Sequence, residues 1–315
     1  MSTLILDHRD LSLDYENHCL LVRHPDQPPR SVPLASLERI LCMHSVQLTS
    51  RLLGHCQQQG IDFIYLNTRH SEYSFALHSQ HQHQAIRRTA QYCLSSNACH
   101  ALPLARLLIC SKLRQTRRLL KTQPVSPEQI SLTATLGQRL HSARHAADMA
   151  TLRGVEGRAQ RELFGYWRHQ LPATLGFSGR ARRPPPDPVN ALLSLTYTLV
   201  YHEAIRQSLA HGLDPWLGFY HQLVHGRQSL ACDLMEPLRP AVEGWVVERF
   251  CSGDFDLRHF SQRGAACLFG KAGRERYYAL WYQQQPQWAK LIARHARWLA
   301  RYLSLGALPA TEEVA

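Results

Sequence analysis

The period of the hydrophobic residues changes near residue 80, and this change constrains the fold more than any other feature of the chain. Before it, short runs such as LILDH, CLLVRH and IDFIYLN are separated by turn-forming residues, as in β-strands. After it, apolar residues recur every three or four positions in stretches such as PLARLLICSKLRQTRRLLK, as in amphipathic helices. The pattern predicts an α+β protein with an N-terminal β-rich domain and a larger all-α C-terminal domain.

The expected domain boundaries follow from this change. We expect the β-rich domain at residues 1–78, a linker with the first helix at 79–97, and the α-helical domain at 98–315. The polar segment HSQHQHQ marks the join. A further break is expected at SGRARRPPPDP, residues 178–188, because three consecutive prolines forbid both helix and strand.

One helix is expected inside the β-rich domain, in the segment LTSRLLGHCQQQG. Thr49 or Ser50 is the expected N-cap, since a hydroxyl oxygen there accepts a free backbone N–H of the first turn. Gly60 stands just past the expected end, where a left-handed backbone conformation is common.

The charge of the chain points to a polyanionic partner. Its 315 residues include 36 Lys and Arg against 24 Asp and Glu, a formal net charge of +12. Nucleic acid is the commonest such partner, because cationic side chains release the counterions condensed on phosphates. No apolar run suits a signal peptide or a spanning helix, which needs about 20 residues, so we expect a cytoplasmic protein without a membrane partner. The nine cysteines include no C-x-x-C pair, which disfavours a zinc site.

One carboxylate lies where a helix is expected to be apolar. Met149, Leu152, Glu156, Ala159 and Leu163 recur at steps of three and four, so they share one helical face. A carboxylate removed from water is costly unless it finds a cation, a metal ion or a proton. The pattern leaves two interpretations open: a buried glutamate paired with one of the many arginines, or a residue of a functional site.

A second group of acids and imidazoles lies in GFYHQLVHGRQSLACDLMEPLRP, which begins at residue 218. Asp233 and Glu236 are spaced to share one helical face, and with His221 they offer ligands that suit Mg²⁺ or Mn²⁺. The acids also fit a helix start, with Asp233 as the N-cap of a capping box or with Pro237 at the first helical position. In both registers they lie at the positive end of a helix dipole. His221 alone also fits a hydrogen-bonded core histidine.

Three segments of the chain resemble, in order and spacing, the core of the CRISPR-associated integrase family Cas-one. They are LRGVEGRAQRELF, DPVNALLSLTYTLVYHEAIRQSLAHGLDPWLGFYH and HGRQSLACDLMEPLRP. The resemblance extends to the N-terminal strands and to PLARLLICSKLRQTRRLL, so it covers nearly the whole chain. It departs at Cys232, where an aliphatic residue is usual, and in GKAGRERYYALWYQQQ, which lacks an acid often found after the aromatic pair.

The resemblance implies a metal-dependent site made of a glutamate, a histidine and an acidic residue. The glutamate of the G-x-E-G-R motif falls on Glu156, and the histidine that closes L-G-F-x-H falls on His221. In L-x-x-D-L-M-E-P the third ligand falls on Glu236, with Asp233 as a catalytic neighbour that supports the site. These residues are expected to use Mg²⁺ or Mn²⁺.

The implied activity is that of a DNA endonuclease and integrase of spacer acquisition in antiviral defence. A 3′ hydroxyl of a captured DNA fragment attacks a phosphodiester in the CRISPR repeat array, and the same site acting with water is a nuclease. The implied partners are double-stranded and branched DNA, a second copy in a homodimer formed by the β-rich domains, and the small protein Cas-two. A stand-alone branched-DNA nuclease and a non-catalytic DNA-binding scaffold are the alternatives.

Basic side chains are expected to contact DNA phosphates without reading sequence. The candidates are Arg106, Lys112, Arg114, Arg117, Arg118 and Lys121 on one expected helix, Arg180, Arg182 and Arg183 on the proline-rich loop, and Arg153, Arg158 and Arg239 in the motifs. A solvated helical face is the other interpretation for any one of them.

Overall fold

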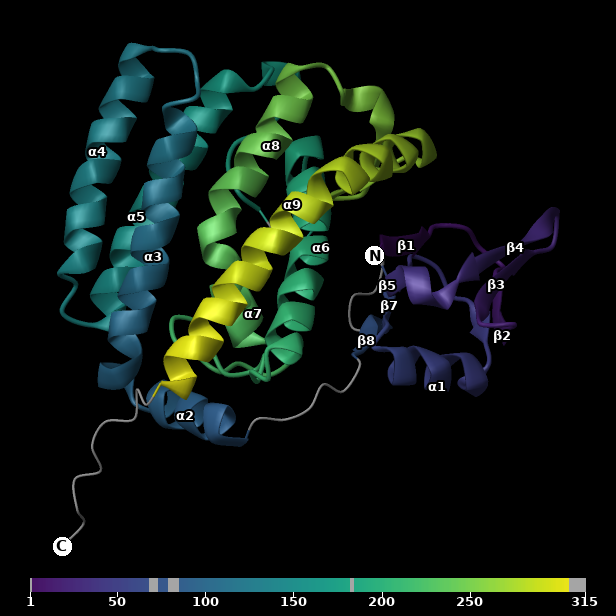
Figure 1. Ribbon diagram of the computed structural model, residues 1–315. Coiled ribbons are helices and arrows are strands. Elements are labelled where there is room, and N and C mark those ends of the chain that lie inside the picture. The colour runs from purple at the N-terminus through teal and green to yellow at the C-terminus, as the bar shows by residue number, and fades with distance from the viewer. Residues whose placement is uncertain (1, 68–72, 79–84, 182–183, 306–315) are drawn as a thin grey trace, which may run out of the picture. The chain divides into compact units, whose positions relative to one another are not determined.

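The computed structural model describes residues 2–67, 73–78, 85–181 and 184–305. The chain forms two compact units, residues 1–83 and 84–315 (Figure 1). The first unit is rich in strands and the second is predominantly helical, which confirms the predicted α+β class. The expected roles of the two parts, dimer contact and catalysis, stay predictions.

In the described residues of the first unit, the strands form two four-stranded sheets. One has the strand order β1-β5-β7-β8, in which the first three strands are parallel and β8 is antiparallel to β7. The other has the order β4-β3-β2-β6, antiparallel except that β6 runs parallel to β2. The strands are β1 (Ser2–Leu6), β2 (Ser12–Glu16), β3 (Cys19–His24), β4 (Gln27–Pro33), β5 (Leu37–Cys42), β6 (Gln47–Leu48), β7 (Asp62–Tyr65) and β8 (Phe75–Leu77).

Helix α1 (Ser50–Gln59) lies within this unit, and its two ends follow the sequence prediction. The Thr49 hydroxyl accepts a hydrogen bond from the backbone N–H of Leu52, so Thr49 is the N-cap. Gly60 ends the helix in the left-handed conformation, with φ of 75°. Leu52 and Cys56 on its buried face join a core to which both sheets contribute.

The second unit is built mainly from α-helices. The helices α3, α4 and α5 pack on one another, α3 also packs on α8, and α6 packs on α7, α8 and α9 (Figure 1). The helices are α2 (Ala85–Ser96), α3 (Ala98–Leu120), α4 (Pro127–Arg144), α5 (Met149–Gln170), α6 (Pro188–Ala210), α7 (Ser229–Met235), α8 (Arg239–Cys251) and α9 (Lys271–Ser304). Short 3₁₀ turns are η3 (Ala173–Leu175), η4 (Glu236–Leu238) and η5 (Leu257–His259), beside η1 (Leu34–Ser36) in the first unit.

Polar residues at the helix starts explain where several of these helices begin. The side chains of Asn97, Ser126, Asp148 and Asp187 each accept a backbone N–H of the first turn that follows. The proline-rich break therefore ends at Asp187, and Pro188 takes the first position of α6, where its fixed φ suits a helix.

A β-hairpin between α8 and α9 departs from the predicted all-α domain. Its strands, β9 (Phe260–Arg263) and β10 (Ala266–Phe269), are only four residues long. Three residues of β9 are exposed, so the sequence carries no alternating apolar signal there. The backbone N–H of Cys267 donates to the carbonyl of Pro185 at 2.8 Å, which joins the hairpin to the proline-rich segment.

Replacing Gly273 by alanine is expected to destabilise the protein by about 1–3 kcal/mol. A Cβ atom there would lie 2.5 Å from the backbone oxygen of His259, so α9 or the hairpin must shift. Urea denaturation measures the effect. The control is Gly165→Ala in α5, where nothing lies within 4 Å of an added Cβ. The control is expected to keep or raise stability by up to about 1 kcal/mol, and equal losses in both variants would contradict this packing.

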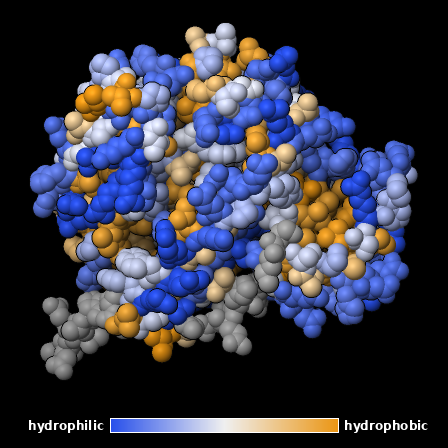
Figure 2. Space-filling model, turned by 45° about the horizontal axis from the view of Figure 1, so that its top comes forward, coloured by the Kyte–Doolittle hydropathy of each residue, from blue (hydrophilic) through white to orange (hydrophobic). Residues whose placement is uncertain are grey.

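Hydrophilic side chains cover most of the face shown in Figure 2, and apolar side chains form separate groups on it. No single helix in the described residues is long and apolar enough to cross a membrane. Charged side chains are rarely buried unless they are paired, so the buried ones mark unusual places. Lys112, Glu236 and Glu243 are each at most 4% exposed, and all three line one cavity of the helical unit.

Candidate active site

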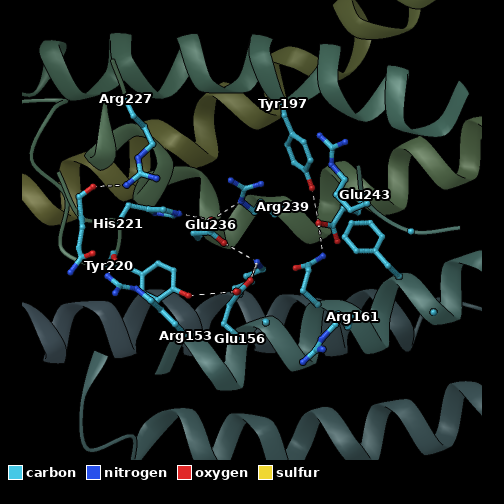
Figure 3. Close-up of a pocket in the computed structure, with 18 of the residues that line it drawn as sticks. Arg153, Glu156, Arg161, Tyr197, Tyr220, His221, Arg227, Glu236, Arg239 and Glu243 are labelled. Carbon is cyan, nitrogen blue, oxygen red and sulfur yellow. Dashed lines mark hydrogen bonds and ion pairs between the residues drawn. The ribbon is translucent and has the colours of Figure 1, made fainter. Parts of the chain in front are cut away.

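The cavity has a volume of about 870 Å³ and lies within the helical unit (Figure 3). Its walls come from α3, α5, α6, α8, the turn η4, residues 178–180 before α6 and the loop that precedes α7. The charged and imidazole side chains that line it are Lys112, Arg153, Glu156, Arg161, Arg168, Arg180, His221, Arg227, Glu236, Arg239 and Glu243. Carboxylates therefore gather inside a cavity whose remaining charge is cationic.

Two of the predicted ligands meet around a lysine. Glu156 projects from the middle of α5, and Glu236 begins the turn η4 between α7 and α8. The Lys112 ammonium from α3 lies between them, 2.5 Å from Glu156 Oε1 and 2.9 Å from Glu236 Oε2. One cation thus holds together two carboxylates that are 80 positions apart in the sequence, Glu156 and Glu236.

The neighbouring charges in the cavity determine the protonation states of Glu236 and Lys112. Burial raises the pKa of Glu236, but Arg239 and then Lys112 outweigh it, so the pKa of this carboxyl lies below its usual value. Burial lowers the pKa of Lys112, yet Glu236 and Glu156 raise it above its usual value. Arg239 Nε donates to Glu236 Oε1 at 2.6 Å. Glu236 is therefore ionised, and Lys112 is protonated, at neutral pH.

His221 reaches the same group from the loop before α7. Its Nε2 lies 3.8 Å from Glu236 Oε1 (Figure 3). Its Nδ1 lies 2.7 Å from Asp233 Oδ1. A carboxylate that engages Nδ1 fixes the ring and leaves Nε2 free to act as a ligand or a base.

Asp233 holds the loop itself. It is fully buried in α7, and its Oδ2 accepts the backbone N–H groups of Phe219 and Tyr220 at 2.6 and 3.0 Å. Its Oδ1 accepts the backbone N–H of His221 at 3.0 Å. Gly218 makes room, because a Cβ there would lie 2.8 Å from Asp233 Oδ2 and 2.9 Å from the backbone of Ser229.

Both helix-start interpretations, with Asp233 as an N-cap or with Pro237 at the first helical position, are therefore wrong. Asp233 lies inside α7 (Ser229–Met235), near its C-terminal end, and not at an N-cap. Its carboxylate binds the N–H groups of a preceding loop, because that loop folds back over α7. Pro237 follows Glu236 in the turn η4 and does not begin the next α-helix.

Two side chains at the far side of the cavity were not predicted from the sequence. Glu243 of α8 is 1% exposed, and its Oε1 accepts hydrogen bonds from the Tyr197 hydroxyl at 2.6 Å and from Gln160 at 2.9 Å. The Tyr197 ring lies beneath two guanidinium groups, those of Arg239 at 4.8 Å and Arg180 at 5.6 Å. Such stacking holds both arginines toward the cavity.

Apart from Lys112, the candidate phosphate contacts in the described residues divide into two sets. Arg153, Arg180 and Arg239 line the cavity, as do Arg161, Arg168 and Arg227, which the sequence analysis missed. The candidates Arg106, Arg114, Arg117, Arg118, Lys121 and Arg158 do not line it. Arg182 and Arg183 lie outside the described residues. Lys112 requires a correction: it is 4% exposed and held by two carboxylates, so it is not a free phosphate contact.

The donor types of this group suit a divalent ion of the Mg²⁺ or Mn²⁺ kind. Glu156 and Glu236 offer carboxylate oxygens, and His221 offers a nitrogen whose ring is fixed from behind by Asp233. In their present spacing, no three His, Cys, Asp or Glu side chains of the described residues are grouped so that they could hold a metal ion. In this arrangement the Lys112 ammonium lies between the two carboxylates.

Comparison with known proteins gives a consistent result. Residues 4–283 match the family model described as CRISPR associated protein Cas1, the Cas-one family of the sequence resemblance. A protein of Thermodesulfovibrio yellowstonii named CRISPR-associated endonuclease Cas1 1 is 32% identical over 296 residues, which cover 90% of this chain and 92% of that protein.

Solved structures of low sequence identity share the fold. A CAS1 protein from Thermotoga maritima superposes with a TM-score of 0.86 at 20% identity and covers 97% of each chain. A casposase bound to an integration product gives 0.83 at 19% identity, over 97% of this chain and 91% of that one. A Cas6-RT-Cas1–Cas2 complex gives 0.84 at 22% identity, over all of this chain and 36% of that one.

Proposed function

The chain belongs to the Cas1 family of CRISPR-associated endonucleases, and on this premise we propose that it joins 3′-hydroxyl ends of captured DNA fragments to a CRISPR repeat array by transesterification. One observation carries the proposal. Glu156, His221 and Glu236 converge from three separate elements on one cationic cavity. Cations on the walls suit a phosphodiester, and carboxylates at the centre suit the ion that phosphoryl transfer uses.

In this proposal Glu156, His221 and Glu236 hold Mg²⁺ or Mn²⁺. When bound, the ion lowers the pKa of the attacking hydroxyl and offsets the charge that develops on the phosphate. Asp233 keeps the Nε2 of His221 directed at the site through its hydrogen bond to Nδ1.

The arginines of the cavity have a separate task, which is to hold and orient the DNA backbone. Arg239 is fixed by Glu236 and by the Tyr197 ring, so its position is set before DNA arrives. Arg180 is fixed by Asn190 at 2.8 Å and by Ser194 at 3.2 Å. Fixed guanidinium groups bind phosphate oxygens with little further loss of side-chain freedom.

The proposed partners are double-stranded and branched DNA, a second copy of the chain in a homodimer formed by the β-rich units, and Cas2. Support comes from the family and from two structures of the same fold, the casposase bound to an integration product and the Cas6-RT-Cas1–Cas2 complex. The chain has 36 Lys and Arg but only 24 Asp and Glu, and this positive net charge also favours a nucleic-acid partner.

Supplying labelled DNA with free 3′ hydroxyls, a plasmid that carries a repeat array, the partner Cas2 and Mn²⁺ tests the reaction. We expect a covalent product in which the labelled strand is joined to the array. Cleavage of branched DNA without joining would support the stand-alone nuclease instead. DNA binding with neither reaction would support the scaffold.

Replacing both Arg161 and Arg168 by alanine is expected to weaken DNA binding about tenfold at 150 mM salt. The slope of the logarithm of affinity against the logarithm of salt concentration is expected to fall in magnitude by about 2. Both are exposed residues of α5 that line the cavity. Fluorescence anisotropy of labelled duplex at several salt concentrations measures both quantities. The matched control is Arg258→Ala with Arg294→Ala, two exposed arginines away from the cavity that remove the same charge. An equal loss of affinity in the control would show that only net charge matters.

A further inference from the structure

The lysine between the two carboxylates has a role that the proposed reaction does not assign. We propose that Lys112 is the built-in counter-cation of the metal site and has two positions. Its ammonium lies between Glu156 and Glu236 while no divalent ion is bound, and it moves to Glu243 when an ion binds. This inference rests on the proposed function, because it takes the ion to bind at Glu156 and Glu236.

The first position is the one in the structure. Lys112 is 4% exposed, and its ammonium lies 2.5 Å from Glu156 and 2.9 Å from Glu236. Two carboxylates that face each other in a buried place repel unless a cation lies between them. The lysine supplies that cation, and it fills the place that a divalent ion must occupy.

The second position is an unused acceptor in the same cavity. Oε1 of Glu243 is occupied by Tyr197 and Gln160, but its Oε2 is buried and has no hydrogen-bond partner in the structure. A buried carboxylate oxygen without a partner is costly and therefore rare in native proteins. Glu243 and Lys112 line the same cavity. Burial raises the pKa of Glu243, and the Lys112 ammonium is the first of the nearby charges that lower it.

In this proposal Lys112 changes its position and Arg239 keeps its own. Arg239 is held at two places, by Glu236 at 2.6 Å and by the Tyr197 ring at 4.8 Å. A lysine ammonium is a compact charge at the end of a flexible four-carbon chain, so it can change partners without a shift of its helix. A divalent ion would repel it, and a buried ammonium needs a new acceptor, which Glu243 provides.

A double-mutant cycle on Mn²⁺ affinity tests this inference without measuring activity. The variants are Lys112→Met, which keeps the length of the side chain without its charge, Glu243→Gln, and the two together. The dissociation constant for Mn²⁺ is measured by titration calorimetry and by the electron paramagnetic resonance signal of free Mn²⁺, on the full chain without DNA.

We expect Lys112→Met to tighten Mn²⁺ binding about tenfold, because the competing ammonium is gone. Glu243→Gln is expected to weaken binding about tenfold, because the displaced lysine has no acceptor. In the Lys112→Met background, Glu243→Gln is expected to have no effect, since there is no ammonium to receive. If Lys112→Met does not fold, Lys112→Gln takes its place with the same expectations.

Two results would overturn the inference. Unchanged or weaker Mn²⁺ binding by Lys112→Met would mean that the lysine does not compete with the ion. An equal effect of Glu243→Gln in both backgrounds would mean that the two residues are not coupled. Glu156→Gln separates these results from a failure of the proposed function, because Mn²⁺ binding that is the same in Glu156→Gln and in the wild type would place the ion elsewhere.

Discussion

Glu156→Gln is expected to reduce metal-dependent strand joining by at least about 10³-fold, equal to about 4 kcal/mol of transition-state stabilisation, while DNA affinity stays within about twofold. The change keeps the size of the side chain and removes the negative charge that faces Lys112 at 2.5 Å and, in our proposal, the divalent ion. The initial rate of joining of a labelled 3′ end in Mn²⁺ measures the first quantity. Fluorescence anisotropy of the same DNA measures the second.

Glu162→Gln is the matched control for this prediction. Glu162 lies on the same helix α5, but it pairs with Arg139 of α4 at 2.6 Å and does not line the cavity. Its joining rate is expected to equal that of the wild type within about twofold, because this partly exposed ion pair lies outside the cavity and such pairs contribute about 1 kcal/mol or less. A rate in Glu156→Gln above a tenth of the wild-type rate would contradict the role of Glu156.

Asp233→Asn is expected to destabilise the folded protein by about 2–5 kcal/mol. The two carboxylate oxygens of Asp233 accept three backbone N–H groups and engage His221 Nδ1. An amide replaces one acceptor oxygen by an NH₂ group that faces other donors, so at least one buried N–H loses its partner. Urea denaturation measures the loss, and the joining rate is expected to fall about 10–100-fold because His221 is no longer fixed.

Asp254→Asn is the control for Asp233→Asn. Asp254 also accepts several hydrogen bonds, from Arg249, Arg276 and Ser252, but it lies at the surface near the end of α8. Asp254→Asn is expected to lower the free energy of unfolding by less than about 1 kcal/mol. A similar small cost at Asp233 would mean that the loop of His221 does not depend on this carboxylate.

The sequence predicted the features that rest on local chemistry. The change from strands to helices near residue 80 follows from residue period, and the ends of α1 at Thr49 and Gly60 follow from capping. Glu156 stood out because a carboxylate interrupted an apolar stripe, and in the structure its partner is Lys112 rather than an arginine. The family resemblance, and not the spacing of residues, linked it to His221 and Glu236.

What the sequence did not predict depends on how distant segments pack. Lys112 looked like one of several basic residues of its helix, although Ile109, Leu113 and Thr116 around it are buried. Glu243 likewise lies beside the buried Val242, Val246 and Val247. The binding of Asp233 to a loop could not be foreseen, because its spacing to Glu236 equally fits a capping box.

The central claim is that Glu156, His221 and Glu236 share one divalent ion. Anomalous diffraction from crystals of the full chain grown with Mn²⁺ tests it most directly. We predict one strong peak at about 2.1 Å from oxygens of Glu156 and Glu236 and from Nε2 of His221, with the Lys112 ammonium displaced from between the carboxylates. The claim would be contradicted if crystals with saturating Mn²⁺ showed no anomalous peak between these residues and Lys112 still bridged Glu156 and Glu236.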